Sequence, residues 1–182
     1  MGNGVTSIGE DAFYNCSGLE SITIPFVGAT KDGTSNTHFG YIFGASSYSY
    51  NDKYVPLSLK TVVITGGKSI GSYAFSGCSG ITSVTIGNGV TSIGSRAFED
   101  CSGLTSVTIS NGVTSIGSYA FDDCSGLTSI IFEDTSTWYR TTSYSDWQNK
   151  TGGTSTSVTN PSTNATYFKS ISYYYDYYWY KK

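Results

Sequence analysis

The chain has 182 residues, a formal net charge of −3 and a pI near 4.9, which is enough chain for one domain with its own core. Because it offers no broad cationic surface, we expect no nucleic-acid partner. It holds no apolar run of about 18 residues, so we expect no membrane insertion.

A repeat of 23 residues organises most of the chain. It is clearest from Val90 to Ile109, and this stretch returns almost unchanged from Val113 onward. Because the apolar residues of one copy cannot form a core alone, neighbouring copies must stack as the turns of a solenoid. The period is kept by three phenylalanines and three cysteines, which are Phe75, Phe98 and Phe121, and Cys78, Cys101 and Cys124.

The first copy opens in the middle of this pattern, because Gly2-Asn3-Gly4-Val5 directly follows Met1. We therefore expect further repeats to precede Gly2 in a longer parent protein. The absence of a basic and apolar leader at the first residues then carries little weight.

Each copy contains the strand pattern Leu-x-x-Val-x-Ile, in which the apolar positions face inward and the residues between them face outward. A shift of one repeat makes such strands parallel and adjacent, so we predict one parallel sheet along one wall. The opposite wall carries Ser-x-Ala-Phe-x-x-Cys between glycines, which is too short for more than about one turn of helix. Five strands can be identified, starting at Leu19, Leu59, Ile81, Leu104 and Leu127.

An insertion interrupts the array at about residues 26–58, because Leu19 and Leu59 are 40 residues apart, 17 more than the repeat. It is rich in aromatic residues separated by Gly and Ser, which predicts an ordered excursion packed on the solenoid by its rings. The aromatic residues are Phe26, Phe39, Tyr41, Phe43, Tyr48, Tyr50 and Tyr54.

The repeat pattern stops after Asp134, so we predict a solenoid over residues 1–134 and an aromatic-rich cap over residues 135–182. The tail contains Trp138, Trp147 and an aromatic run from Tyr173 to Tyr180. A solenoid must shield its last open turn, and a compact β-rich cap does so.

The pattern Val-x-x-Ile-Gly-x-x-Ala-Phe-x-x-Cys-x-x-Leu-x-x-Val-x-Ile, as in Val90 to Ile109, resembles the repeat of BspA-like leucine-rich-repeat proteins. The resemblance covers residues 4–25 and 59–134. It implies a β-dominated leucine-rich-repeat solenoid with a parallel sheet on the concave wall, short helical or 3-10 turns opposite, and a C-terminal cap. It also implies a secreted or surface-anchored bacterial protein that attaches to host matrix or to other cells, with no catalytic residue and no cofactor.

The cysteines do not indicate a disulfide or a metal site. Stacking places them in a file with spacings of about 4.7–4.9 Å and parallel side chains, whereas a disulfide needs facing Cβ atoms about 3.5–4.5 Å apart. We therefore predict buried free thiols for Cys78, Cys101 and Cys124, and for Cys16 of the first copy. The single histidine, His38, lies beside Phe39 and is interpreted as a packing residue, so we expect no enzyme.

The candidate binding surface consists of the outward strand positions and the tyrosines of the insertion. The strand positions make two rows of small hydroxyls on a wall of low charge, although Ser and Thr there can also serve strand propensity and solubility alone. The candidates are Ser21, Thr23, Thr61, Ser83, Thr85, Ser106, Thr108 and Ser129 on the wall, and Tyr41, Tyr48 and Tyr50 in the insertion.

Three functions remain open at this point. The first is a non-enzymatic surface or secreted module that binds protein partners such as host matrix or cell-surface proteins. The second is carbohydrate binding, which would need three or more exposed and coplanar aromatic rings within residues 138–180. The third is a structural spacer without saturable binding.

Overall fold

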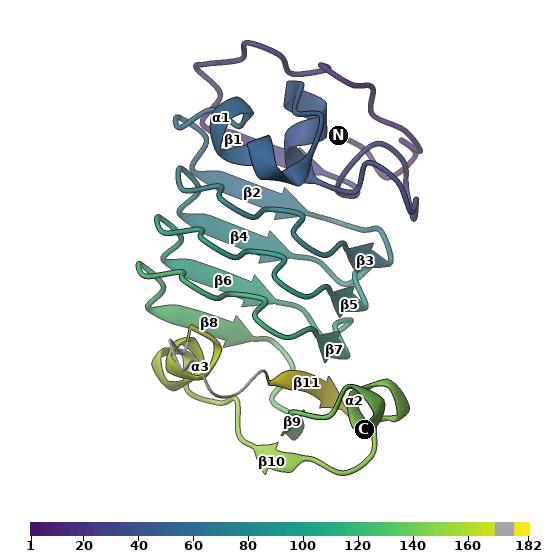
Figure 1. Cartoon of the computed structure of the whole chain (residues 1–182), viewed down its shortest axis with the longest axis vertical. Coiled ribbons are helices and arrows are strands. Elements are labelled where there is room, and N and C mark those ends of the chain that lie inside the picture. Colours follow the sequence, from purple (N-terminus) through teal and green to yellow (C-terminus); the bar gives the residue numbers. More distant parts are fainter. Residues whose placement is uncertain (170–176) are drawn as a thin grey trace.

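The structure is a computed structural model that describes residues 1–169 and 177–182 of the chain. The chain winds into stacked turns that carry one sheet along each of two walls (Figure 1). An aromatic-rich cap follows the last turn.

Five parallel strands form the sheet along the first wall. They are β1 (Ser21–Ile24), β2 (Thr61–Ile64), β4 (Ser83–Ile86), β6 (Ser106–Ile109) and β8 (Ser129–Phe132). Their order in the sheet follows the chain, and each residue pairs with the same repeat position in the next turn, as Ser83 does with Ser106. The predicted sheet is confirmed.

The strands form because their residues alternate in character. The second and fourth positions carry Val, Ile or Phe and are buried, while the first and third carry mostly Ser and Thr and keep some exposure. β-Branched residues suit a pleated surface that is buried on one side.

The opposite wall holds a second sheet that the sequence pattern did not predict. Its parallel part consists of the two-residue strands β3 (Ser69–Ile70), β5 (Ser92–Ile93) and β7 (Ser115–Ile116). The turns that follow them are not helical, because alternate backbone N–H groups bond to the next turn of the solenoid. Tyr73 N donates to Ser95 O at 3.1 Å and Phe75 N donates to Ala97 O at 2.7 Å. The short helices and 3-10 turns lie in the insertion and the cap instead.

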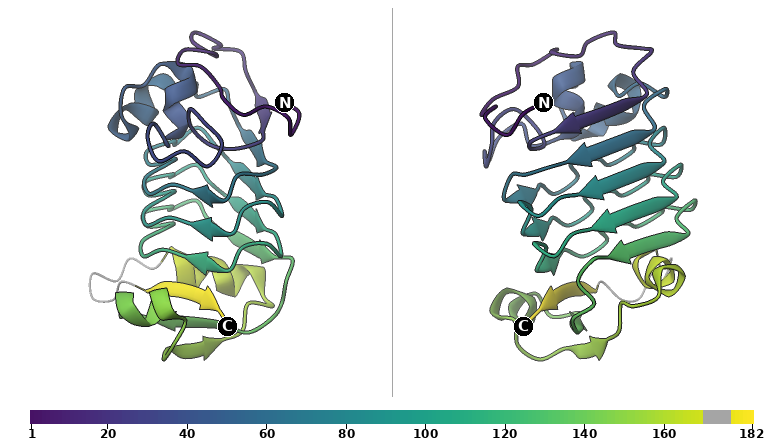
Figure 2. Two further views of the ribbon diagram at one scale, coloured as in Figure 1. Left: turned by 90° about the vertical axis from the view of Figure 1, so that its right-hand side faces the viewer. Right: turned by 180° about the vertical axis from the view of Figure 1, so that it is seen from behind.

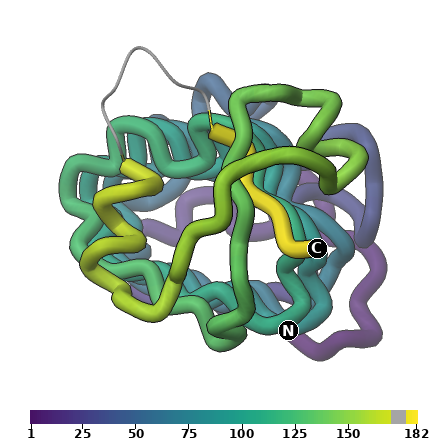
Figure 3. The backbone as a smooth tube through the Cα atoms, turned by 90° about the horizontal axis from the view of Figure 1, so that it is seen from below, coloured from purple at the N-terminus to yellow at the C-terminus, as the bar shows by residue number. Residues whose placement is uncertain are grey.

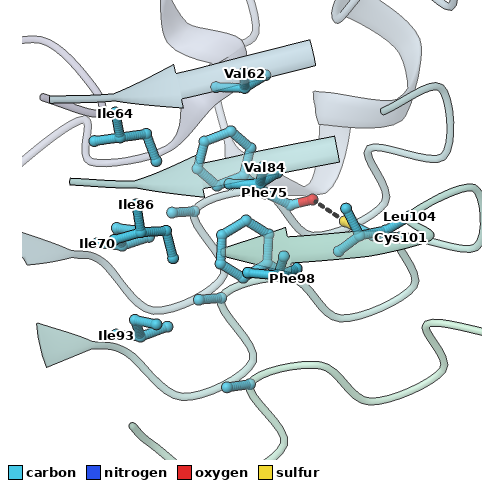
Figure 4. Packing of buried hydrophobic residues seen from close by; sticks show 14 of the residues in the cluster. Val62, Ile64, Ile70, Phe75, Val84, Ile86, Ile93, Phe98, Cys101 and Leu104 are labelled. Atoms are coloured by element: carbon cyan, nitrogen blue, oxygen red, sulfur yellow. Dashed lines mark hydrogen bonds between the residues drawn. The ribbon is translucent and has the colours of Figure 1, made fainter. Parts of the chain in front are cut away.

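A column of phenylalanine rings fills the space between the two walls. The ring centroids of Phe75 and Phe98 are 4.9 Å apart with planes 10° from parallel, and those of Phe98 and Phe121 are 5.1 Å apart at 1°. Figure 4 shows Phe75 and Phe98 above one another beside the inward valines and isoleucines. The column continues to Phe39, 4.5 Å from Phe75, and to Phe168, 5.9 Å from Phe121.

The insertion forms an enlarged turn of the solenoid. It contains the 3-10 helices η1 (Phe39–Phe43) and η2 (Tyr48–Tyr50) and the helix α1 (Asn51–Tyr54). Phe39 N donates to Ala74 O at 2.7 Å, and Ile42 O accepts from Phe13 N at 2.7 Å. These bonds link the insertion to the turn before it and the turn after it, as in the regular repeats.

Asn51 fastens this enlarged turn to its neighbour. Its side chain is fully buried, its Oδ1 accepts from Gly40 N at 2.9 Å, and its Nδ2 donates to Ala74 O and Ser76 O at 3.2 and 3.1 Å. One amide side chain therefore satisfies three backbone groups that no repeat strand reaches.

The cap consists of β9 (Trp138–Thr141), α2 (Tyr144–Asn149), β10 (Thr154–Thr156), α3 (Pro161–Phe168) and β11 (Tyr178–Lys181). β11 lies antiparallel between β7 and β9, so the cap continues the second sheet. α3 packs on β8, where Asn164 Nδ2 donates to Ile130 O at 2.9 Å. Viewed along the stack, the cap segments cross the end of the last turn (Figure 3).

Candidate interaction surface

The outward residues of the first wall lie in two columns. The strand register aligns Ser21, Thr61, Ser83, Ser106 and Ser129 in one column, and Thr23, Val63, Thr85, Thr108 and Ile131 in the other. We call these two columns the hydroxyl wall. Seen from behind, the five strands of this sheet lie side by side along one face (Figure 2, right).

The hydroxyls of this wall make no hydrogen bond to any other described residue. Threonines at the start of the same strands behave differently: Thr82 Oγ1 donates to Lys60 O at 3.1 Å, Thr105 Oγ1 to Thr82 O at 2.9 Å and Thr128 Oγ1 to Thr105 O at 3.2 Å. The flanking threonines therefore reinforce the fold, whereas the wall hydroxyls keep their full bonding capacity for solvent or a partner.

Few charges border the hydroxyl wall. The strands of the wall contain no charged residue. At one end of the wall, Glu20 and Lys60 line a shallow hollow of about 420 Å³, and the other lining residues are Ser21, Ser58 and Thr61. Lys60 Nζ donates to Leu57 O at 2.6 Å and to Gly80 O at 3.1 Å, so part of its bonding capacity is already used. The face suits an uncharged partner.

The tyrosines predicted for the same site belong to a different surface. Tyr48 and Tyr50 are exposed, and the Tyr48 ring stacks on Tyr73 of the opposite wall at 4.5 Å. Tyr41 is partly buried and packs against the core and the edge of His38. The structure thus separates the insertion tyrosines from the hydroxyl wall.

A column of large side chains on the opposite wall was missed by sequence reasoning. Arg96 stands between Tyr73 and Tyr119, with its Cζ 5.8 and 4.8 Å from the ring centroids, and its Nη1 donates to Tyr73 Oη at 2.9 Å. All three residues have a positive φ, near 55–57°. Their shared place before Ala-Phe in each copy is the signal that could have revealed the column.

The ionisable side chains in and beside this column have shifted pKa values. The hydrogen bond with Tyr73 raises the pKa of Arg96. Arg96 Nε lies 3.3 Å from Glu99 Oε1, yet burial raises the pKa of Glu99 and outweighs this ion pair. Burial likewise raises the pKa of Asp122, with the nearby Asp123 carboxylate adding to the effect.

Three of the four predicted buried thiols are confirmed. Cys78, Cys101 and Cys124 are buried, and the last two donate Sγ–H to Phe75 O and Phe98 O at 3.0 Å. Desolvation raises the pKa values of Cys78 and Cys101. The prediction for Cys16 is wrong: this thiol is exposed, because among the described residues only the following turn packs beside its own.

The described residues contain no metal-binding cluster, and the single histidine has a packing role. No cluster of three or more His, Cys, Asp or Glu in that part of the chain is arranged to hold a metal ion. His38 is buried, and its Nε2 lies 2.8 Å from Ala45 O, which is the packing role that was predicted.

The cap aromatics form an interior. Trp138, Trp179 and Tyr180 are buried, and among the described cap residues Tyr144 is the aromatic side chain that is mostly exposed, at 59%. Its ring lies 48° from the plane of Trp147 and 69° from that of Tyr178. Tyr173, Tyr174 and Tyr175 lie outside the described residues. The coplanar exposed rings that sugar stacking needs do not occur in the described part of the cap.

These features define a leucine-rich-repeat solenoid with a cap. The family model described as "BspA type Leucine rich repeat region" matches residues 1–34 and 47–175 in six copies. The chain belongs to the BspA-type leucine-rich-repeat family. Such repeats generally mediate protein binding, are typically non-enzymatic, and are typically found at the surface or in secreted proteins.

Comparison with other known proteins adds little to this assignment. The chain is similar to a leucine-rich-repeat protein of T. pallidum known from a crystal structure, with 27% identity and a TM-score of 0.39. The match covers 41% of this chain and 38% of that one. No curated protein matches the chain. Across the residues that the structure describes, no helix has the length and apolar character to span a membrane.

Proposed function

We propose that this protein is a non-enzymatic interaction module that acts at a cell surface or after secretion and binds a protein partner through the hydroxyl wall. The observation that carries the proposal is the set of wall hydroxyls that have no hydrogen-bond partner among the described residues, next to threonines just before the same strands that do have one. A partner can satisfy these hydroxyls without breaking any bond of the fold.

The scaffold also supports this role. The wall is carried by strands whose inward residues are buried, so its geometry is fixed before a partner arrives. A preorganised surface loses little conformational entropy on binding. The low charge of the wall favours recognition by shape and neutral hydrogen bonds over electrostatic steering.

The experiment is a binding screen of the purified protein against host matrix proteins, cell-surface proteins and glycans, repeated with Thr108→Lys. Lysine at this position introduces a charge and a long side chain in the middle of the wall. Ser102→Lys is the matched control, because Ser102 is exposed in a turn outside the wall and its side chain makes no hydrogen bond to the described residues.

We expect saturable binding to a protein that Thr108→Lys weakens at least about tenfold, as for a central interface position, and that Ser102→Lys preserves. Equal binding by both variants would place the site elsewhere. No saturable binding at all would favour the spacer. Deletion of the insertion is not a suitable test, because it would remove the buried rings of Phe26, Phe39 and Phe43 from the core.

A further inference from the structure

A column of large side chains runs along the outer side of the opposite wall. The ring of Tyr48 stacks on that of Tyr73 with centroids 4.5 Å apart, and the guanidinium of Arg96 lies between Tyr73 and Tyr119. Tyr48 is exposed, and the other three side chains are partly exposed. We call these four residues the ring column. Further repeats before Gly2 would stack on the first turn, which contributes no residue to this column.

The backbone does not require large side chains in the ring column. Tyr73, Arg96 and Tyr119 have φ values of 57°, 55° and 56°, in the left-handed region that residues other than Gly, Asn and Asp rarely adopt. In the first turn the same place before Ala-Phe is held by Asp11, with a φ of 60°. Because an aspartate meets the demands of the fold at this place, the tyrosines and the arginine of the later copies point to a role outside the fold.

Carboxylates outnumber cations beside the ring column. Glu99 and Asp122 hold one repeat position in successive turns, and Asp100 and Asp123 hold the next one. Arg96 Nε lies 3.3 Å from Glu99 Oε1, whereas Asp122 has no ion pair with any described residue. Burial raises the pKa values of Glu99 and Asp122. A further cation at this place would therefore stabilise the ionised carboxylates.

The ring column borders a small hollow at its cap end. The hollow is about 30 Å³ in volume, and its lining includes Tyr119 and Asp122 of the solenoid and Tyr167 and Tyr177 of the cap. The two cap tyrosines already hold one guanidinium, because Arg140 Cζ lies 5.7 and 4.9 Å from their ring centroids. A hollow of this size, with rings and a carboxylate in its lining, suits the head group of one cationic side chain.

Arg96 shows which cation the ring column accepts. Its Cζ lies 5.8 Å from the ring centroid of Tyr73 and 4.8 Å from that of Tyr119. A guanidinium is planar and stacks on aromatic faces, whereas an ammonium is a compact and strongly hydrated charge. Arginine side chains of a partner therefore suit these rings better than lysine side chains do.

We propose that the ring column and the carboxylates beside it form a second binding site, which takes an arginine-rich segment of a partner protein. Guanidinium groups of the segment stack on Tyr48 and Tyr119 and pair with Asp122 and Asp123, and one of them enters the hollow. The charge of the site complements that of the segment. The site is distinct from the uncharged hydroxyl wall, and it does not rest on the function proposed for that wall.

The test uses a hexa-arginine peptide, titrated into the isotope-labelled protein at about 0.15 M salt, where long-range attraction between exposed charges is screened. Amide NMR follows the binding, and we expect saturable shifts centred on Tyr73, Arg96 and Tyr119. A hexa-lysine peptide carries the same charge and should bind at least about threefold more weakly, because an ammonium stacks less well on a ring.

Substitutions of Tyr119 test the part played by the rings. Tyr119→Asn removes the ring and keeps a residue that tolerates a φ of 56°, so it should weaken the hexa-arginine peptide at least about threefold. Tyr119→Phe keeps the ring and breaks no hydrogen bond to a described residue, so it should retain binding. Tyr48→Ser provides a second ring variant if the amide spectrum of Tyr119→Asn departs from that of the parent.

A pair of charge variants separates this site from the general acidity of the protein. Asp122→Asn should weaken the hexa-arginine peptide at least about threefold, as for one lost charged contact. Glu133→Gln removes the same charge from an exposed residue just after β8, outside the site, and should leave the affinity unchanged.

Three results would overturn the proposal. The first is the absence of saturable binding of the hexa-arginine peptide. The second is equal affinity for the two peptides, or an equal loss for Asp122→Asn and Glu133→Gln, because the peptide would then respond to net charge alone. The third is a set of shifts centred on Ser106 and Thr108, which would assign the peptide to the hydroxyl wall.

Discussion

Interior residues of the repeat have a packing role that the period alone identifies. Phe75, Phe98 and Phe121 recur at one position, and the structure stacks their rings with centroids about 5 Å apart. Each ring contacts the equivalent ring one turn away, so the loss of one ring leaves a cavity between two others. The exposed rings of the insertion have no such neighbours on both sides.

Phe98→Ala should therefore lower the free energy of unfolding by about 3–5 kcal/mol, the usual cost of removing a buried phenylalanine. Tyr50→Ala should cost less than about 1 kcal/mol, because this side chain is half exposed. Urea unfolding at equilibrium measures both values. Similar losses for the two variants would mean that the rings do not form an interior column.

The thiols should divide into one reactive group and three protected groups. Cys16 is exposed, whereas burial raises the pKa of Cys78 and Cys101 and keeps them protonated. With a colorimetric disulfide reagent at pH 8, the native protein should show one rapidly reacting thiol, and the unfolded protein should show all four. Cys16→Ser is the control and should abolish the rapid reaction of the native protein. Rapid reaction of a second thiol in the native protein would contradict the stacked interior.

The stability of the folded protein should depend on pH through the carboxyl group of Asp122. Burial raises its pKa in the folded protein, so the folded state holds the proton more tightly than the unfolded state does. The stabilisation that comes from the protonated carboxyl is complete below the ordinary pKa of about 4 and is lost as pH rises through the raised folded value.

Asp122→Asn should accordingly raise the melting temperature at pH 7, where the wild-type carboxylate is ionised at a cost, and should have little effect at pH 3, where the carboxyl is neutral in both states. Calorimetry at the two pH values measures the difference. A destabilisation at pH 7 that disappears at pH 3 would reverse the sign and show that the ionised form is the stabilising one.

At the scale of elements, the regular strands could be predicted from the sequence and the irregular turn could not. The strand pattern repeats in register with the chain, so its neighbours follow from the period alone. The enlarged turn lacks this pattern: Phe39 of η1 supplies the ring that packs on Phe75, and Asn51 bonds to backbone groups of residues 74 and 76. Contacts of this kind join residues far apart in the sequence and do not recur with the 23-residue period, so the sequence pattern does not reveal them.

Asn51→Leu tests the attachment of this turn. The change leaves Gly40 N and Ser76 O without their partner, while Ala74 O keeps its bond from Phe39 N. Because each unpaired buried group costs about 1–3 kcal/mol, the free energy of unfolding should fall by at least about 2 kcal/mol. Asn149→Leu is the matched control, since that residue is exposed at the end of α2. A loss below that of the control would mean that the enlarged turn is held by its rings alone.

The sequence predicts which residues of the candidate site face outward, but it does not predict which of their hydroxyls lack a partner or which tyrosines lie apart from the wall. Alternation identified the outward residues from Ser21 to Ser129, because a strand exposes every second side chain. A threonine hydroxyl bonds to the backbone only where it lies close to the preceding turn. The hydroxyl of Thr105 does so and that of Thr108 does not, and this difference follows from the structure and not from the sequence pattern. The separation of Tyr48 from the wall likewise follows from the path of the insertion, which carries it to Tyr73.

At the scale of the whole molecule, one core runs from the enlarged turn to the cap. Phe39, Phe75, Phe98, Phe121 and Phe168 are in successive ring contact, and Phe168 lies 4.3 Å from Trp179 of the cap. A repeat array is held by neighbour contacts and can lose cooperativity when one interface is weak. The β11 pairing with β7 joins the cap to the second sheet and strengthens the last interface.

The most direct measurement of this continuity is equilibrium unfolding in urea followed by two probes in different parts of the molecule. Tryptophan fluorescence reports the cap, because all three tryptophans lie there at positions 138, 147 and 179, while the reactivity of Cys78 and Cys101 reports the middle of the array. We predict one transition with the same midpoint for both probes. Loss of the fluorescence signal at a urea concentration that leaves both thiols protected would contradict a single continuous core.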